Sequence, residues 1–526
     1  MSLKKEGQGR VVIAAYDFGT TGCKASFYKQ DGELVATAHH PYPTNFPQVG
    51  WVEQDPADWK TAFLRTTTEL LDRSKIQPSE IACIAFSGHM MGCVPVDKNG
   101  TPLSNRAMLW ADNRSRLQAD RILEVIGWER FYSDTGGGLD VVLYPAAKIG
   151  WIKENEPDLY RQTAKFIGTK DVICAWLTGN IATDFSDASN TGLLHLKNHT
   201  WQQDFLKTLG IDQDKMPQLL PSTAIVGKLS HQAARTVGLI EGTPVVLGGG
   251  DVACGTAGAG AITENVPYMC IGSAAWVSVA TKEPVIHMLA RPMTVAHVVP
   301  GLYTSQIIMF SAGVAYKWAR DEIFLESSLP GQEDSESDSF EQVNQLAATS
   351  PIGSRGVIFL PYMRPGGAPH FDLSARGAFV GLNLTVKKAD LIRAALEGIA
   401  LNVRIMLQHL EEKRVFDNIR IIGGGAKSDL WRQIFANVLK KDVLTLSAQQ
   451  EANTLGAAVV GGVAIGAFED FSAVYRFTRI TEVTSVDPDA ASIYDELFQV
   501  FRECYEGLRG TNKSLSQTRA SRMADG

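Results

Sequence analysis

One pattern occurs in both halves of the chain, and it constrains the fold more than any other feature. Residues 16–28 read YDFGTTGCKASFY, and residues 268–280 read YMCIGSAAWVSVA. Each stretch joins two apolar runs through a glycine and a small hydroxyl residue, which is typical of two strands joined by a tight turn. Because the pattern occurs once in each half, it predicts a duplicated fold with two glycine turns.

The rest of the chain predicts an α/β protein. Short apolar runs bounded by glycine alternate with longer helical patterns over 526 residues, enough for at least two domains. The pair Asp31-Gly32 predicts a hairpin turn, so the chain opens with an antiparallel hairpin and not with a Rossmann unit. Helices are predicted over 55–74, 391–412 and 428–440. Strands are predicted over 11–16, 25–28, 34–38, 81–87, 244–247, 268–271, 356–360 and 419–422.

The composition of the chain argues against some kinds of binding partner and indicates a cellular compartment. A net charge of −7 and a pI near 5.9 argue against nucleic-acid binding. The seven cysteines form no CxxC pair, which predicts reduced thiols and a cytoplasmic location. One long and nearly uncharged stretch, 243–262, is rich in glycine and contains Asp251, so no membrane segment is predicted.

The first glycine turn has the residues of a phosphate clamp. Gly19 allows a ligand to approach the backbone, Thr20 and Thr21 offer amide and hydroxyl donors, and Lys24 adds positive charge. Asp17 could hold a hydrated Mg²⁺ that bridges phosphates. The Walker sequence is absent. An ordinary hairpin with a solvated carboxylate remains an alternative.

A second strand also ends in glycines and an acid. The run Gly248-Gly249-Gly250 would let a substrate lie against the backbone, and Asp251 follows it directly. A carboxylate at this point could accept the proton of a sugar hydroxyl while the hydroxyl oxygen attacks phosphorus. The alternative is a tight turn with a capping aspartate.

Two further glycine turns lie in the second half. The amides of Gly272 and Ser273 could hold the β- and γ-phosphates. The run Gly423-Gly424-Gly425 precedes a helix predicted to start near Ser428, and the amino end of that helix, with Ala426 leaving room, suits an adenosine and its phosphates. The spacing is not GxGxxG, so a dinucleotide fold is only a weak alternative.

Together these motifs resemble the FGGY carbohydrate kinases, relatives of hexokinase and actin. Segment 377–397, GAFVGLNLTVKKADLIRAALE, fits one family signature, and the segment around 145–152 fits the other except at Leu143. Family blocks are also visible at 50–56, 110–114 and 184–187. The resemblance runs from residue 11 to about residue 508.

The resemblance implies two ribonuclease-H-like α/β domains with an interdomain cleft. The N-terminal domain, 11–247, would bind sugar and carry the first phosphate turn, the C-terminal domain, 248–508, would bind nucleotide, and 509–526 would form a polar tail. ATP and Mg²⁺ would be required, and a homodimer is a family expectation. Asp251 would be the catalytic base, and Asp17 and Asp251 would lie at the metal. Nucleotide contacts are implied at Gly272, Ser273, Gly313, Gly425 and Asp429.

Within the family the chain is most similar to members acting on xylulose, which implies phosphorylation of a terminal hydroxyl of a ketopentose such as D-xylulose. Those members usually read GQMHG where this chain has His89, Met90 and Met91 between two glycines, and usually have Asn where it has Val252. Such changes alter sugar selectivity. Gluconate, ribulose or glycerol are therefore alternative substrates, and a catalytically silent regulator is a further alternative.

Two other residues are candidates for the sugar site, each with a structural alternative. Trp51 could stack on a sugar face or fill the core. Asp112 could bind a sugar hydroxyl or form an ion pair.

Overall fold

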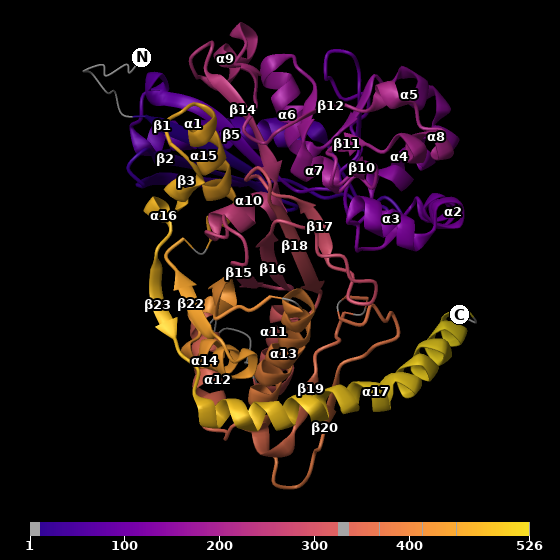
Figure 1. The fold of residues 1–526 in the computed structure, drawn as a ribbon, viewed down its shortest axis with the longest axis vertical. Helices are drawn as coiled ribbons and strands as arrows, with labels where there is room; N and C mark the ends of the chain where they lie inside the picture. The colour runs from indigo at the N-terminus through magenta and orange to yellow at the C-terminus, as the bar shows by residue number, and fades with distance from the viewer. Residues whose placement is uncertain are drawn as a thin grey trace, which may run out of the picture. The chain divides into compact units, whose positions relative to one another are not determined.

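The computed structural model describes residues 11–324, 336–364, 366–367, 369–412, 414–448 and 450–524. The chain forms two compact units (Figure 1). The first contains residues up to 264 together with 280–305 and 451–479, and the second contains 265–279, 306–450 and the residues from 480 onward. No described helix is both long and apolar enough to cross a bilayer.

The first unit has a six-stranded sheet at its centre. The neighbours along it are β13, β14, β5, β1, β2 and β3. β1 is antiparallel to β2 and parallel to β5, and β14 is also parallel to β5. The bounds of these strands are β1 (Val12–Phe18), β2 (Gly22–Lys29), β3 (Leu34–Pro41), β5 (Ile81–Gly88), β13 (Ile225–Lys228) and β14 (Pro244–Gly250).

Helices cover both faces of this sheet, so its central strands are apolar throughout rather than alternating. Tyr16 packs against Phe63 of α1 (Pro56–Ser74) on one face. Ile13 points to the other face, where it lies close to Gly461 of α15 (Ala452–Ala464). Two more helices matter for the site, α6 (Thr169–Thr178) and α10 (Asp251–Gly258).

The sheet of the second unit repeats the same order. The neighbours along it are β23, β22, β21, β15, β16, β18 and β17 (Met293–Ala296), and the first six correspond in order to β13, β14, β5, β1, β2 and β3. β15 is antiparallel to β16 and parallel to β21, as β1 is to β2 and β5. The duplication predicted from the two glycine turns is therefore confirmed. The bounds are β15 (Pro267–Ile271), β16 (Ala275–Thr281), β18 (Tyr303–Met309), β21 (Asn418–Ile422), β22 (Asp442–Leu446) and β23 (Ile480–Thr484).

Four helices of the second unit are used below. They are α11 (Gly313–Ala319), α12 (Glu336–Ala348), α13 (Lys388–Glu411) and α14 (Asp429–Leu439). The helices predicted over 391–412 and 428–440 correspond to α13 and α14, and Ser428 caps α14 by accepting from the amide of Trp431 at 3.2 Å.

Two predictions about chain organisation differ from this structure. A single boundary was expected near residue 247, but the chain leaves and re-enters the first unit, because α15 is needed to cover the apolar face of β1 and β5. The tail expected over 509–526 is helical as far as it is described, since α17 (Pro488–Ala524) continues through it (Figure 1). Its sequence is polar but has no helix-breaking proline.

Candidate active site

The first acid of the site lies near the carboxyl end of β1. The Oδ1 atom of Asp17 accepts from the hydroxyl of Ser87 at 2.7 Å, and Oδ2 accepts from the side-chain amide of Asn453 at 3.2 Å. Burial raises the pKa of Asp17 although both hydrogen bonds oppose this shift. The carboxyl group is thus fixed by residues of β5 and α15 and remains partly exposed.

The second acid begins helix α10. One oxygen of Asp251 accepts from the amide of Val252 at 2.8 Å, and the residue is partly exposed. Burial, together with the negative charge of Asp17, raises the pKa of Asp251 to about 7. The two carboxyl groups are therefore close enough to repel one another, and the structure brings the two predicted catalytic acids together in one unit.

The three glycines before Asp251 are required by the packing of the protein itself. Gly248 has φ of +70°, and a Cβ there would lie 1.8 Å from the carbonyl oxygen of Phe86. A Cβ on Gly250 would lie 2.5 Å from the sulfur of Met90. Protein atoms thus fill the space that the missing side chains of Gly248 and Gly250 leave, and contact between a substrate and this backbone stays a prediction.

The first glycine turn lies beside Asp17. The amide of Gly19 donates to the carbonyl of Gly22 at 3.0 Å, and the indole of Trp110 donates to the hydroxyl of Thr20 at 3.2 Å. Lys24 is opposite Asp17 in the β1–β2 register, and its charge opposes the rise in the pKa of Asp17. Thr21 is exposed.

His89, which follows β5, is a buried neutral imidazole. Its Nε2 lies 3.0 Å from the hydroxyl of Thr169, and its ring makes an edge contact with Trp59. Burial, and secondarily the charge of Lys148, lowers the pKa of His89 to about 4. Its side chain is 2% exposed. This geometry favours the packed histidine over the sugar ligand.

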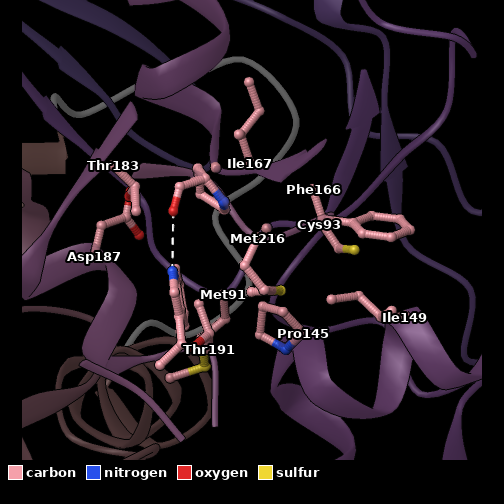
Figure 2. A pocket seen from close by; sticks show the side chains of 14 residues that line it. Met91, Cys93, Pro145, Ile149, Phe166, Ile167, Thr183, Asp187, Thr191 and Met216 are labelled. Carbon is pink, nitrogen blue, oxygen red and sulfur yellow. Dashed lines mark hydrogen bonds between the residues drawn. The ribbon is translucent and has the colours of Figure 1, made fainter. Parts of the chain in front are cut away.

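The two methionines that follow are also buried, and they have different surroundings. Met90 packs on Gly250, next to the second acid. Met91 lines a small cavity of about 20 Å³ (Figure 2). Thr183 and Asp187 lie on one side of this cavity, and Phe166 and Ile149 lie on the other. It has room for a water molecule but not for a sugar.

Asp112 and Trp51 are both engaged by Arg114. The carboxylate of Asp112 is inaccessible and accepts from Nε and Nη2 of Arg114 at 2.9 and 2.7 Å, and from the amide of Val52 at 2.7 Å. The guanidinium lies 3.6 Å from the centre of the Trp51 ring, which also makes an edge contact with Trp151. The structural ion pair is thus the favoured role of Asp112, and packing that of Trp51.

Lys148 of α4 (Pro145–Asn155) was not identified from the sequence. Its fully buried Nζ donates to the carbonyls of Met91, Leu109 and Leu143 at 2.7–2.8 Å. One ammonium group thereby ties together three loops, two of them next to candidate sugar residues. The lysine lies in a segment matched to a family signature, but nothing in the sequence reveals its three partners.

A cavity of about 550 Å³ lies entirely in the second unit, and its volume is within the usual range for small-molecule sites. Four residues predicted to contact nucleotide line it: Gly272, Ser273, Gly313 and Gly425. Ala426 is buried and does not line it, and Asp429 instead pairs with Arg432 at 2.9 Å.

Close approach of two turns shapes this cavity. The amide of Gly313, at the start of α11, donates to the carbonyl of Gly272 at 2.9 Å. Three aromatic residues of the wall were missed, namely Tyr316, Phe340 and Trp431, which come from three helices. The rings of Tyr316 and Trp431 are 5.3 Å apart. The only sequence signal for these three residues is their helical spacing. That spacing is the same for residues that line a site and for residues that pack in the core.

Matches to family models show which protein family the chain belongs to. The model for the N-terminal domain of the FGGY family of carbohydrate kinases matches residues 12–258, and the model for its C-terminal domain matches residues 268–465. The chain belongs to the FGGY family of carbohydrate kinases. This FGGY kinase is therefore a sugar phosphotransferase, and its two-domain α/β fold is the one predicted.

Individual relatives agree on the class of enzyme but differ in substrate. The xylulose kinase of Staphylococcus epidermidis is 30% identical over 509 residues, 96% of this chain and 98% of that protein. The gluconokinase of Bacillus subtilis is 30% identical over 492 residues, 92% and 94% of the two chains. The structure of ligand-bound xylulose kinase from Lactobacillus acidophilus has a TM-score of 0.87 at 28% identity and covers 96% and 99% of the two chains.

The acid pair of this FGGY kinase fits a magnesium ion that is shared with phosphates. Among the residues that the structure describes, no three His, Cys, Asp or Glu side chains converge as a metal site. Mg²⁺ is commonly held by one or two carboxylates plus substrate phosphates and water, so two acids suffice. The raised pKa values of Asp17 and Asp251 reflect burial and, at Asp251, repulsion between the two acids that a cation would relieve.

Proposed function

We propose that this protein transfers the γ-phosphoryl group of ATP to a terminal hydroxyl of D-xylulose, giving D-xylulose 5-phosphate and ADP. The acid pair, which places a partly exposed carboxylate of pKa about 7 at the first turn of α10, carries the proposal. The xylulose kinases among the relatives support the ketopentose.

In the proposed reaction Asp251 orients the hydroxyl and takes its proton as the oxygen attacks the γ-phosphorus. The bond from the γ-phosphorus to the bridging oxygen breaks, and ADP leaves with the electron pair. A base with a pKa near the working pH suits this task. Mg²⁺, when bound, neutralises phosphate charge, and Asp17 would hold it. The cavity lined by Gly272, Ser273, Gly313 and Gly425 would hold the nucleotide.

Gluconate is the second candidate, because a gluconokinase is as similar in sequence as the xylulose kinases. Apolar side chains at Met91 and Val252 also remove polar groups that ketopentose-specific relatives are expected to have. A site that lacks such donors discriminates less strongly between substrates.

Product analysis separates these candidates. The protein is incubated with ATP and Mg²⁺ and with D-xylulose, D-gluconate, L-ribulose or glycerol, and the products are measured by mass spectrometry. We expect the phosphorylated ketopentose, with kcat/KM at least about tenfold above that for gluconate, a difference of about 1.4 kcal/mol. A higher kcat/KM for gluconate would replace the substrate in our proposal.

The same assay tests the base. Asp251→Asn keeps the size of the side chain but cannot accept the proton, so we expect kcat to fall by about 10²–10⁴-fold. Binding of D-xylulose, followed by calorimetry without ATP, should stay measurable. Turnover close to that of the unmodified protein would refute the assignment of Asp251.

A further inference from the structure

A hydrogen-bonded chain reaches the turn that carries Asp251. The amide of Gly250 donates to the hydroxyl oxygen of Ser186 at 2.9 Å. The Ser186 hydroxyl donates in turn to Oδ2 of Asp184 at 2.5 Å. Gly250 is the N-cap residue of α10, so this bond holds the residue immediately before Asp251.

The direction of each bond in this chain is fixed by its chemistry. The carboxylate of Asp184 can only accept, so the single proton of Ser186 must point to it, which leaves the serine oxygen to accept from Gly250. Asp184 is inaccessible, lies 3.0 Å from the ammonium of Lys170, and also accepts from the hydroxyl of Ser222 at 2.8 Å. A buried carboxylate with these partners has no freedom to turn away.

Ser186 is not needed for the capping of its own helix. In α7 (Phe185–Ser189) Asp184 is the N-cap residue, and its side chain accepts from the amides of Ser186 and Asp187. The hydroxyl of Ser186 is directed instead at β14. Its side chain is fully buried, and a Cβ on Gly249 would lie 2.9 Å from its oxygen, so the serine and the glycine turn are packed together.

We propose that Ser186 is a positioning residue for Asp251. By holding the amide of Gly250, Ser186 fixes where α10 starts and hence where the carboxylate of Asp251 lies. The inference rests on the proposed role of Asp251 as base. It adds a residue that touches neither substrate nor the reacting atoms.

The chain supplies a closely matched control. Ser189 lies on the same helix, is equally buried, donates to the carbonyl of Phe185 at 2.7 Å and accepts from the amide of Ala296 at 3.0 Å. Ala296 belongs to β17 (Met293–Ala296), which carries no residue of the acid pair. Ser186→Ala and Ser189→Ala thus remove the same group from the same helix. They differ in which amide loses its acceptor, and in whether the lost donor served the carboxylate of Asp184 or the carbonyl of Phe185.

We expect Ser186→Ala to lower kcat by about 10- to 100-fold with ATP-Mg²⁺ and D-xylulose, since small misplacements of a catalytic group have effects of this size. KM for both substrates should change less than about threefold, because the variant does not remove contacts that bind the ground state and the transition state equally. Ser189→Ala should leave kcat within about threefold while lowering the melting temperature to a similar extent. Ser186→Thr, which keeps the hydroxyl, should recover part of kcat.

Equal kcat for the two alanine variants, or a loss in Ser186→Ala expressed mainly in KM, would overturn the inference. If Ser186→Ala does not fold, amide hydrogen exchange of the intact protein decides the question. The amide of Gly250 should be protected, and rapid exchange there would contradict the inference. Should Asp251→Asn retain full turnover, the proposed role of Asp251 as base fails, and the positioning role of Ser186 fails with it. Loss of turnover in Asp251→Asn with no difference between Ser186→Ala and Ser189→Ala would reject the positioning role alone.

Discussion

At the scale of single residues, the acid pair costs the folded protein stability. The pKa of Asp251 is raised to about 7 in the folded protein, whereas an aspartate in an unfolded chain has a pKa of about 3.9. The folded state therefore binds this proton more tightly than the unfolded state. The loss of folding free energy caused by ionising Asp251 is absent below the pKa of the unfolded chain. It grows as the pH rises and reaches its full value above about pH 7.

Asp251→Asn should accordingly raise the melting temperature at pH 8, and by a much smaller amount at pH 4.5. The neutral amide removes both the burial of a charge and its repulsion with Asp17. Thermal unfolding followed by fluorescence in EDTA, without nucleotide, measures this effect free of bound cations. A lower melting temperature for the variant at pH 8 would show that the charged carboxylate is stabilising and would contradict the raised pKa.

At the scale of elements, the site depends on the crossing of α10 and α15. A Cβ on Gly456 would lie 1.9 Å from the carbonyl oxygen of Cys254, and one on Gly258 would lie 1.8 Å from the carbonyl oxygen of Ala452. The two helix backbones are therefore in direct contact at glycines. Because α10 begins with Asp251 and α15 carries Asn453, which holds Asp17, this crossing helps to position both acids.

Gly456→Ala should force the two helices apart and destabilise the protein by at least about 1–3 kcal/mol, the usual cost of overpacking. Turnover should fall as well, since both acids move. The matched control is Gly507→Ala on α17, where a Cβ meets nothing within 4 Å. That change should stabilise its helix by up to about 1 kcal/mol. Equal melting temperatures for the two variants would show that the crossing tolerates a methyl group.

At the scale of the whole molecule, the proposed function would place its two chemical tasks in different compact units. The acid pair and its supporting residues belong to the first unit, and the large cavity belongs to the second. Nucleotide binding and proton transfer should thus be separable by mutation. Gly424 lines the cavity, and a Cβ there meets no protein atom within 4 Å.

Gly424→Leu should fill part of the nucleotide cavity without displacing protein. We expect the Kd for ATP to rise at least about tenfold, while the melting temperature without nucleotide and the affinity for sugar stay close to their original values. Isothermal titration with ATP and, separately, with D-xylulose checks both parts. Unchanged ATP affinity would place the nucleotide elsewhere.

The sequence was sufficient to predict the features that are local in the chain. Asp17 and Asp251 were found because each follows an apolar run and lies within two residues of a glycine. The duplicated fold was found because its two turns share a short pattern. The predicted hairpin at Asp31-Gly32 is confirmed between β2 and β3.

Features that depend on distant partners could not be predicted. Asn453 reaches Asp17 across 436 positions, and Ser186 reaches Gly250 across 64. Lys148 looks like an ordinary helical lysine until its three carbonyl partners are seen. The favoured roles of Asp112 and His89 likewise depend on Arg114 and Thr169, whose proximity no local pattern reveals.

The late return of the chain to the first unit has a consequence for biosynthesis. Residues 451–479, which include α15 and Asn453, are translated only after the rest of the first unit has been made. Until they emerge from the ribosome, β1 and β5 lack their cover on one face and Asp17 lacks one of its two donors. A nascent chain arrested before residue 451 should therefore bind chaperones through that apolar face, although more than four hundred of its residues have already been translated.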